Sequence, residues 1–169
     1  MRVFWIVVAS LMTVGCWMSP SDNDSEFFTW TVDGEAFEAS SNGTAGGRLK
    51  GNSDITAAVV GSDCGPADRR RGMSLFFLVD PHVGMYRVGD VFSARSSFGI
   101  QPDDGSGFSW EASHERGSGS VTVERVSQNR ISGHFSLQMA PAAESPATGV
   151  KSVIGQFDAS FKNPERGVC

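Results

Sequence analysis

The chain has 169 residues, enough for one domain that removes about two-thirds of its unfolded surface from water. Hydrophobic residues make up 40% of it, with 12 Phe and 4 Trp for a packed core, while 20 Gly and 7 Pro indicate many turns and short strands. The formal net charge of −5 argues against nucleic acid as a partner, because phosphates are bound by clustered Lys and Arg.

The first residues have the pattern of a targeting segment. Arg2 precedes the apolar stretch Val3–Met12, which is shorter than the roughly 20 residues that a membrane-spanning helix needs but matches a signal-peptide core. Residues 13–15 (TVG) then lead into Cys16. Here the segment resembles a bacterial lipoprotein signal, in which a small residue precedes the cysteine that is lipidated, although Thr13 stands where that signal prefers Leu. The alternative is a plain secretory signal that leaves a free thiol.

This resemblance implies a lipid anchor and places the protein in the cell envelope. Residues 1–15 would be removed, Cys16 would carry the acyl chains that attach the protein to the membrane, and 16–26 would form a polar tether. Trp17 follows the cysteine where an Asp would hold the protein at the inner membrane, so the resemblance favours the outer membrane. Residues 27–169 are then the folded domain.

The two remaining cysteines are an even pair. In an oxidising compartment we expect Cys64 and Cys169 to form a disulfide, which in the chain-entropy model contributes up to about 4.7 kcal/mol for a loop of about 100 residues. The alternative is two reduced thiols.

The domain begins with a predicted β-hairpin. Segments 27–32 and 35–39 flank Asp-Gly at 33–34, the dipeptide favoured in a two-residue type I′ turn. This register places Trp30 opposite Phe37 on one face of the hairpin.

The middle of the chain reads as short strands separated by polar turns. We predict strands at 47–50, 55–60, 73–79, 85–88, 91–98 and 108–112. Segment 73–79 is nearly all apolar, which is typical of a central strand covered on both faces.

The last third has the clearest alternation, with strands predicted at 120–126, 131–139 and 150–161. Gly133 and Gly155 each precede a Phe by two residues, which indicates two neighbouring strands built alike. Glycine inside a strand marks a bulge or the close approach of another backbone.

These elements predict an all-β domain, an antiparallel β-sandwich or partly closed barrel of about eight to ten strands. The order of elements resembles a group of small bacterial envelope lipoproteins, through "FTWTVDGEAFEAS", "GMYRVGD", "GSVTVERVSQNRISGHFSLQ" and "GQFDASF". That resemblance implies a β-sandwich envelope protein without an assigned activity.

Two groups of residues suit ligand binding. The arginine run Arg69, Arg70 and Arg71 is suited to a carboxylate, a phosphate or an acidic glycan, although a solvated loop on an acidic protein is the favoured interpretation. Phe108 and Trp110 are suited to contact with a sugar or a protein partner, as exposed aromatic side chains.

Residues for metal or catalytic chemistry are sparse, so we predict no metal site, no cofactor and no catalytic residue. His134 is expected on the solvent face of its strand, and His114, beside Glu115, reads as part of a solvated polar loop. Asp103 and Asp104 before a glycine form an ordinary turn signal.

Two functions remain open. The first is a non-catalytic, lipid-anchored module for binding or envelope structure, which the signal, tether and sandwich support. The alternative is a small envelope hydrolase acting on glycans. It would pair Asp103 or Asp104 with Glu111, and it requires two carboxylates about 5 to 9.5 Å apart across a cleft.

Overall fold

In the computed structural model the described residues are 26–39, 44–48, 55–63, 70–90, 94–101 and 107–161. These residues contain eleven strands and no helix: β1 (Phe27–Val32), β2 (Glu35–Glu38), β3 (Thr44–Arg48), β4 (Ala57–Ser62), β5 (Arg70–Phe77), β6 (Gly84–Val88), β7 (Ala94–Gln101), β8 (Phe108–Ala112), β9 (Ser118–Val126), β10 (Arg130–Pro141) and β11 (Lys151–Ser160). The described part of the chain accordingly holds no helix of the length and apolarity needed to cross a membrane.

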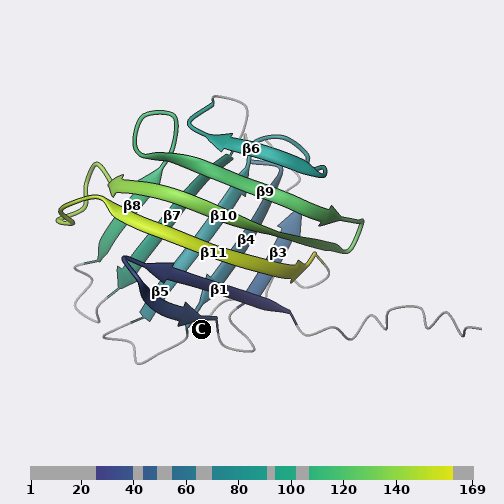
Figure 1. The fold of residues 1–169 in the computed structure, drawn as a ribbon, viewed down its shortest axis with the longest axis horizontal. Helices are drawn as coiled ribbons and strands as arrows, with labels where there is room; N and C mark the ends of the chain where they lie inside the picture. Colours follow the sequence, from purple (N-terminus) through teal and green to yellow (C-terminus); the bar gives the residue numbers. More distant parts are fainter. Residues whose placement is uncertain are drawn as a thin grey trace, which may run out of the picture.

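The strands form two layers around a closed ring, so the all-β prediction is confirmed. Figure 1 shows β1, β11, β10 and β9 in front, crossing steeply over β3, β4, β5 and β7 behind. Five strands close the ring in the order β10-β9-β6-β7-β8, and β8 returns to β10. The contact between β6 and β7 is parallel and the other pairings are antiparallel. Strands β11, β1 and β2 extend the ring from β10, while β5, β4 and β3 extend it from β7.

The first hairpin has the predicted geometry. Asp33 and Gly34 have φ values of 50° and 91°, as a type I′ turn requires at both central positions. Trp30 lies opposite Phe37, and their rings stack with centroids 5.7 Å apart.

Strands β10 and β11 pack through two reciprocal glycine–phenylalanine pairs, which we call the glycine seam. Gly133 lies opposite Phe157, and Phe135 lies opposite Gly155. A Cβ on Gly155 would lie 2.4 Å from the Phe135 ring and from the Thr29 carbonyl oxygen, so no side chain fits there. The pairing of β9 with β10 shifts register beside Gly133, so the predicted bulge and the predicted close approach are both present.

Three predictions about the middle strands were wrong in detail. Strand β5 begins at Arg70 instead of residue 73, because the ladder with β7 continues through the pair Arg70–Gln101. One face of β5 is buried, not both: Phe76 on the outer face is half-buried, with the Arg95 guanidinium 5.3 Å from its ring centre. The weak strand expected at 47–50 is β3, which ends at Arg48.

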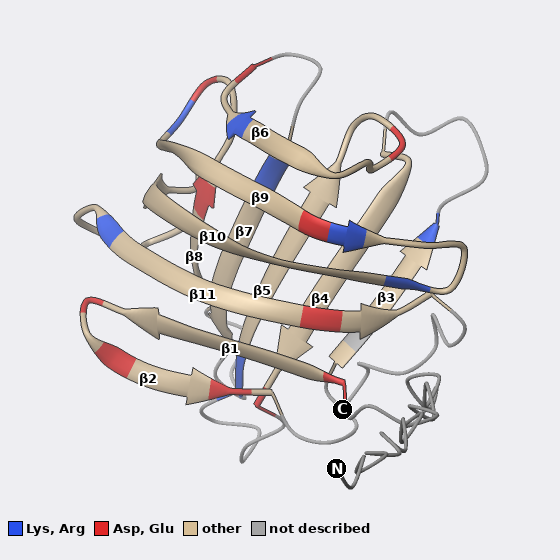
Figure 2. Cartoon of the chain, turned by 45° about the vertical axis from the view of Figure 1, so that its right-hand side comes forward, with Lys and Arg blue, Asp and Glu red and all other residues tan. Residues whose placement is uncertain are grey.

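The core lies between the layers and is rich in aromatic side chains. The largest fully buried residues include Trp30, Phe28, Phe77, Phe98, Phe135 and Phe157. Figure 2 shows a basic residue and an acidic residue toward opposite ends of β11, which its sequence identifies as Lys151 and Asp158. Lys151 is in phase with the buried Val153 and Phe157 and faces inward, whereas Asp158 lies on the opposite face of the strand.

Candidate functional site

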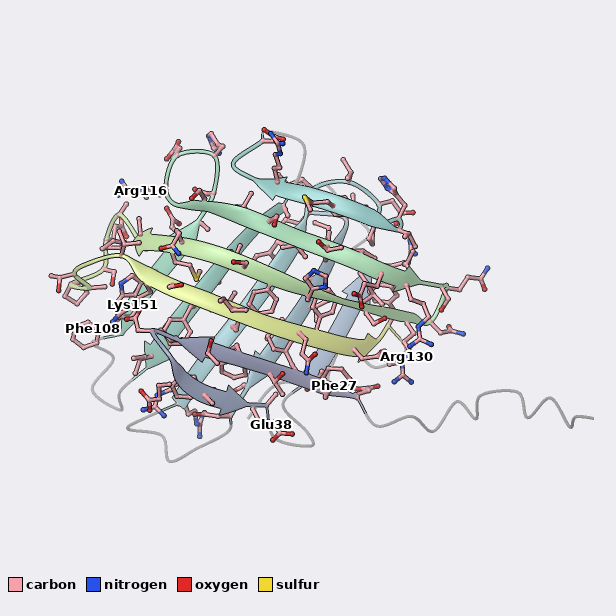
Figure 3. The ribbon with its side chains drawn as sticks, viewed as in Figure 1. Phe27, Glu38, Phe108, Arg116, Arg130 and Lys151 are labelled. Carbon is pink, nitrogen blue, oxygen red and sulfur yellow. The ribbon has the colours of Figure 1, made fainter. Side chains whose placement is uncertain are left out.

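A cleft of about 480 Å³ opens at one end of the sandwich, and we call it the end cleft. Its lining comes from the β1–β2 hairpin, from strands β5, β7 and β8, and from the segment leading into β11. Figure 3 shows two of the lining residues, Phe108 and Lys151, close together at this end of the molecule. The cleft therefore joins residues that are far apart in the sequence.

The alternation of side chains along each strand explains why these residues face the cleft. On β5, Arg71 lies in phase with the buried residues Met73, Leu75 and Phe77, so it continues their inward row to the end of the layer. On β8, Phe108 continues the inward row of Trp110 and Ala112 in the same way. The lining is the end of the core, where the rows of inward side chains reach solvent.

The floor of the end cleft is aromatic. The rings of Trp110 and Phe98 stack with centroids 5.8 Å apart and an interplanar angle of 29°. Trp110 is 6% exposed, and its indole N–H donates to the Gly149 carbonyl oxygen at 3.1 Å. Phe108 is 38% exposed and forms the accessible aromatic surface above this floor.

Lys151 forms a closed ion pair at one side of the cleft. Its Nζ lies 2.7 Å from Asp33 Oδ2 and 5.6 Å from the centre of the Trp110 ring. The Ser152 amide donates to Asp33 Oδ1 at 3.0 Å. The hydrogen bond from Lys151, followed by that from Ser152, holds the pKa of Asp33 below its ordinary value of 3.8.

Arg71 forms a more open arrangement at the other side. Its guanidinium lies over the Phe37 ring, 4.7 Å from the centroid. Its Nη2 is 3.8 Å from Glu35 Oε1, and its Nη1 is 3.9 Å from Asp63 Oδ2. The Arg71 backbone amide donates to Asp63 Oδ1 at 3.0 Å, which fixes the start of β5 at this point.

A second hollow of about 650 Å³ lies on the outer face of β1, β2, β10 and β11. Thr29, Thr31, His134 and Gln156 line it, and no Lys or Arg is among its described lining residues. It is a shallow depression on a sheet face, whereas the end cleft combines aromatic rings with charges of both signs. The end cleft is therefore the stronger candidate.

The ligand-binding residues predicted from the sequence separate in the structure. Arg71, Phe108 and Trp110 meet at the end cleft, but Arg70 points to the opposite face of β5. Both described arginines lie in a strand, not in the expected loop, because β5 pairs with β7 from its first residue. Trp110 is buried under the cleft instead of exposed, since it lies on the inward face of β8.

Several other predictions lie outside the described residues. They concern Cys16, Cys64, Cys169, Arg69, Asp103 and Asp104. The proposed hydrolase pair is therefore untested, and Glu111, its described member, forms an ion pair of 3.4 Å with Arg116.

The histidines predicted in polar surroundings are on the surface. His134 is solvent-facing as predicted and lies 3.1 Å from Glu124 Oε1, while His114 lies 3.5 Å from Glu115 Oε1. Within the described ranges, no group of three or more His, Cys, Asp or Glu side chains is arranged to hold a metal ion.

The sequence interpretation missed Asp33, Glu35, Phe37 and Lys151 as members of the site. The position of Glu35 could have been predicted from the alternation of side chains on β2. Glu35 is two residues before Phe37, so both side chains lie on the same side of the hairpin. For Lys151 no local signal existed, because its partner Asp33 is 118 residues away.

Comparison with known proteins adds no family assignment. No family model matches this chain, and no curated protein or solved structure matches it either. The fold and the end cleft define the class: an all-β, two-layer domain with a closed ring of five strands and an aromatic-floored cleft at one end.

Proposed function

We propose that this chain is a lipid-anchored binding module of the bacterial cell envelope and that the end cleft is its ligand site. The cleft carries the proposal, because it combines a partly exposed aromatic ring with a few charged groups in a volume of about 480 Å³. Small-molecule sites typically occupy about 300 to 1,000 Å³ and have this kind of lining.

A non-catalytic role fits the chemistry of the cleft walls. Both oxygens of Asp33 already accept hydrogen bonds, from Lys151 and from the Ser152 amide. Glu35 is mostly exposed and faces the Arg71 guanidinium. Such groups orient and hold a ligand.

Binding through the end cleft is tested by filling it. The full-length chain, kept with its lipid in mild detergent, is applied to an array of oligosaccharides and peptides. Thr148→Trp places a large ring at the exposed lip of the cleft and should abolish retention of whatever the unmodified protein binds. Ile154→Trp on the opposite, solvent-facing side of the front layer is the matched control and should bind normally. Equal retention by Thr148→Trp, or no retention of any array member by the unmodified protein, would overturn the assignment.

The anchor is proposed at Cys16, with removal of residues 1–15, and 16–26 as the tether to the outer membrane. Two or more acyl chains hold a protein firmly to a membrane, whereas one chain attaches it only marginally. In a bacterial host, Cys16→Ser should abolish labelling by a fatty-acid probe and release the protein from the membrane fraction. Cys64→Ser is the control and should remain labelled. Unchanged membrane association of Cys16→Ser would contradict the proposal.

The same location carries a proposal for the other two cysteines. In the oxidising envelope we expect Cys64 and Cys169 to form a disulfide. A maleimide reagent should then modify neither thiol in the unfolded protein unless a reductant is added first. Labelling of both without reductant would show that the bridge is absent.

A further inference from the structure

We propose that the end cleft binds a neutral sugar, whose hydroxyl groups form hydrogen bonds with Arg71 and Glu35 and whose ring lies against Phe108. This inference rests on the proposed function of the cleft and adds the ligand class to it. It follows from the geometry of one ion pair and from the charges that surround it.

The Arg71–Glu35 pair is too wide for a direct hydrogen bond. Its N···O distance is 3.8 Å, and the second carboxylate near the guanidinium, from Asp63, is 3.9 Å away. Protein N–H···O hydrogen bonds have distances of about 2.7 to 3.2 Å. The Lys151–Asp33 pair in the same cleft, at 2.7 Å, is within that range. Of the two cations among the described residues that line the cleft, Arg71 thus has the donors to offer to a ligand.

A hydroxyl group is the chemistry that satisfies both members of the wide pair. A guanidinium only donates hydrogen bonds and a carboxylate only accepts them, whereas a hydroxyl does both. A ligand hydroxyl between the two side chains accepts from Arg71 Nη2 and donates to Glu35 Oε1. The 3.8 Å separation leaves room for an oxygen in hydrogen-bond contact with each atom.

The charges around the Arg71–Glu35 pair disfavour the binding of ionic ligands relative to neutral ones. An anion at Arg71 would meet the carboxylates of Glu35 and Asp63, which both lie within 4.0 Å of the guanidinium. A cation at Glu35 would meet Arg71 itself. A neutral polyol is repelled by neither the carboxylates nor the guanidinium. It still forms hydrogen bonds with both charged groups, and such bonds are stronger than those between neutral groups.

The apolar part of the ligand has a prepared surface as well. Phe108 exposes 38% of its surface beside the half-buried Ile100, on the same face of the cleft. The guanidinium is held in place by its contact with Phe37 and by the fixed backbone of Arg71. A donor that is already positioned loses little conformational freedom when the ligand binds.

The ligand class is tested with matched oligosaccharides. Neutral tetramers of glucose, galactose, mannose and N-acetylglucosamine, and the uronate tetramers of glucose, galactose and mannose, are titrated into the full-length protein in detergent by calorimetry. We expect at least one neutral tetramer to bind. The uronate tetramer of the same sugar should bind at least tenfold more weakly. For N-acetylglucosamine the comparison is with the glucuronate tetramer. Tighter binding of the uronates, or binding of no neutral tetramer, would overturn the inference.

Variants of the pair separate the inference from the proposed function. Arg71→Gln and Glu35→Gln should each weaken binding of the neutral sugar by about tenfold or more, since each loses a hydrogen bond to a charged group. Arg70→Gln and Glu38→Gln lie on the same two strands but face the other way, so both should bind normally.

The sign of the Glu35→Gln effect decides between the two ligand classes. In an anion site, removing the Glu35 charge would raise affinity, and that result would overturn the neutral-sugar assignment while the cleft remained the binding site. Retained binding by the cleft-filling Thr148→Trp variant would instead overturn the proposed function itself. The near-ultraviolet circular dichroism of Arg71→Gln and of Glu35→Gln should match that of the unmodified protein, because both side chains are partly exposed and neither change adds or removes an aromatic ring.

Discussion

The glycine seam and the end cleft are built by the same alternation of inward and outward side chains, but they pack in opposite ways. In the seam each phenylalanine faces a glycine on the neighbouring strand, so the two strands fill each other's space. In the end cleft, large rings such as Trp110 and Phe98 stack below a mouth that contains charged groups. The contrast shows how one core can be sealed along a strand pair and open at its end.

The largest loss of stability is expected for a substitution at Gly155, where the glycine seam has no space for a side chain. Gly155→Val should destabilise the protein by about 4 to 5 kcal/mol, because a Cβ there would lie 2.4 Å from a backbone oxygen and from the Phe135 ring. Chemical denaturation monitored by tryptophan fluorescence measures this loss. Gly72→Ala is the matched control within a strand, since its nearest atom would be 3.8 Å away, and its stability should change little. A small loss for Gly155→Val would show that the seam is not tightly packed.

The seam was visible in the sequence because its signals are local. The Gly-x-Phe spacing around Gly133 and Gly155, and the Asp-Gly turn of the first hairpin, act between residues that are adjacent or on paired strands. Alternation within such strands is set by their own side chains. These features were therefore predictable without knowledge of the layer arrangement.

The end cleft was predictable only in part, because it depends on which strand ends meet. Arg71 could have been assigned an inward position by extending the apolar row of Met73, Leu75 and Phe77 two residues back. Its proximity to Glu35 depends instead on how the β1–β2 hairpin lies over the end of β5, which no local pattern encodes. The same reason explains why Trp110 was expected at the surface.

Within the cleft, floor and mouth should respond differently to the same change. Trp110→Ala should cost about 3 to 5 kcal/mol, because it removes a 6% exposed ring and leaves a cavity against Phe98. Phe108→Ala, two residues earlier on the same face, should cost less than about 1 kcal/mol in stability, because this side chain is 38% exposed. Urea unfolding of both variants gives the comparison. Similar losses would mean that Phe108 belongs to the core instead of the accessible wall.

The Asp33–Lys151 pair should have the smallest effect on stability, and that effect should disappear in acid. Because folding lowers the pKa of Asp33, the ionised carboxylate stabilises the fold fully above the unfolded pKa, which is near 3.8, and this contribution is lost as pH falls through the lower, folded-state pKa. Asp33→Asn preserves the turn, because Asn also adopts positive φ, but it removes the charge.

The measurement is the urea midpoint of both proteins from pH 2 to pH 7. Asp33→Asn should be slightly less stable than the unmodified protein at pH 5 to 7, and the two midpoints should converge toward pH 2. Lys151→Met should reproduce this loss, and combining the two changes should add little, since both remove the same 2.7 Å contact. A constant difference down to pH 2 would show that the pair does not hold the hairpin turn against β11, and that Lys151, like Arg71, has donors to offer at the cleft.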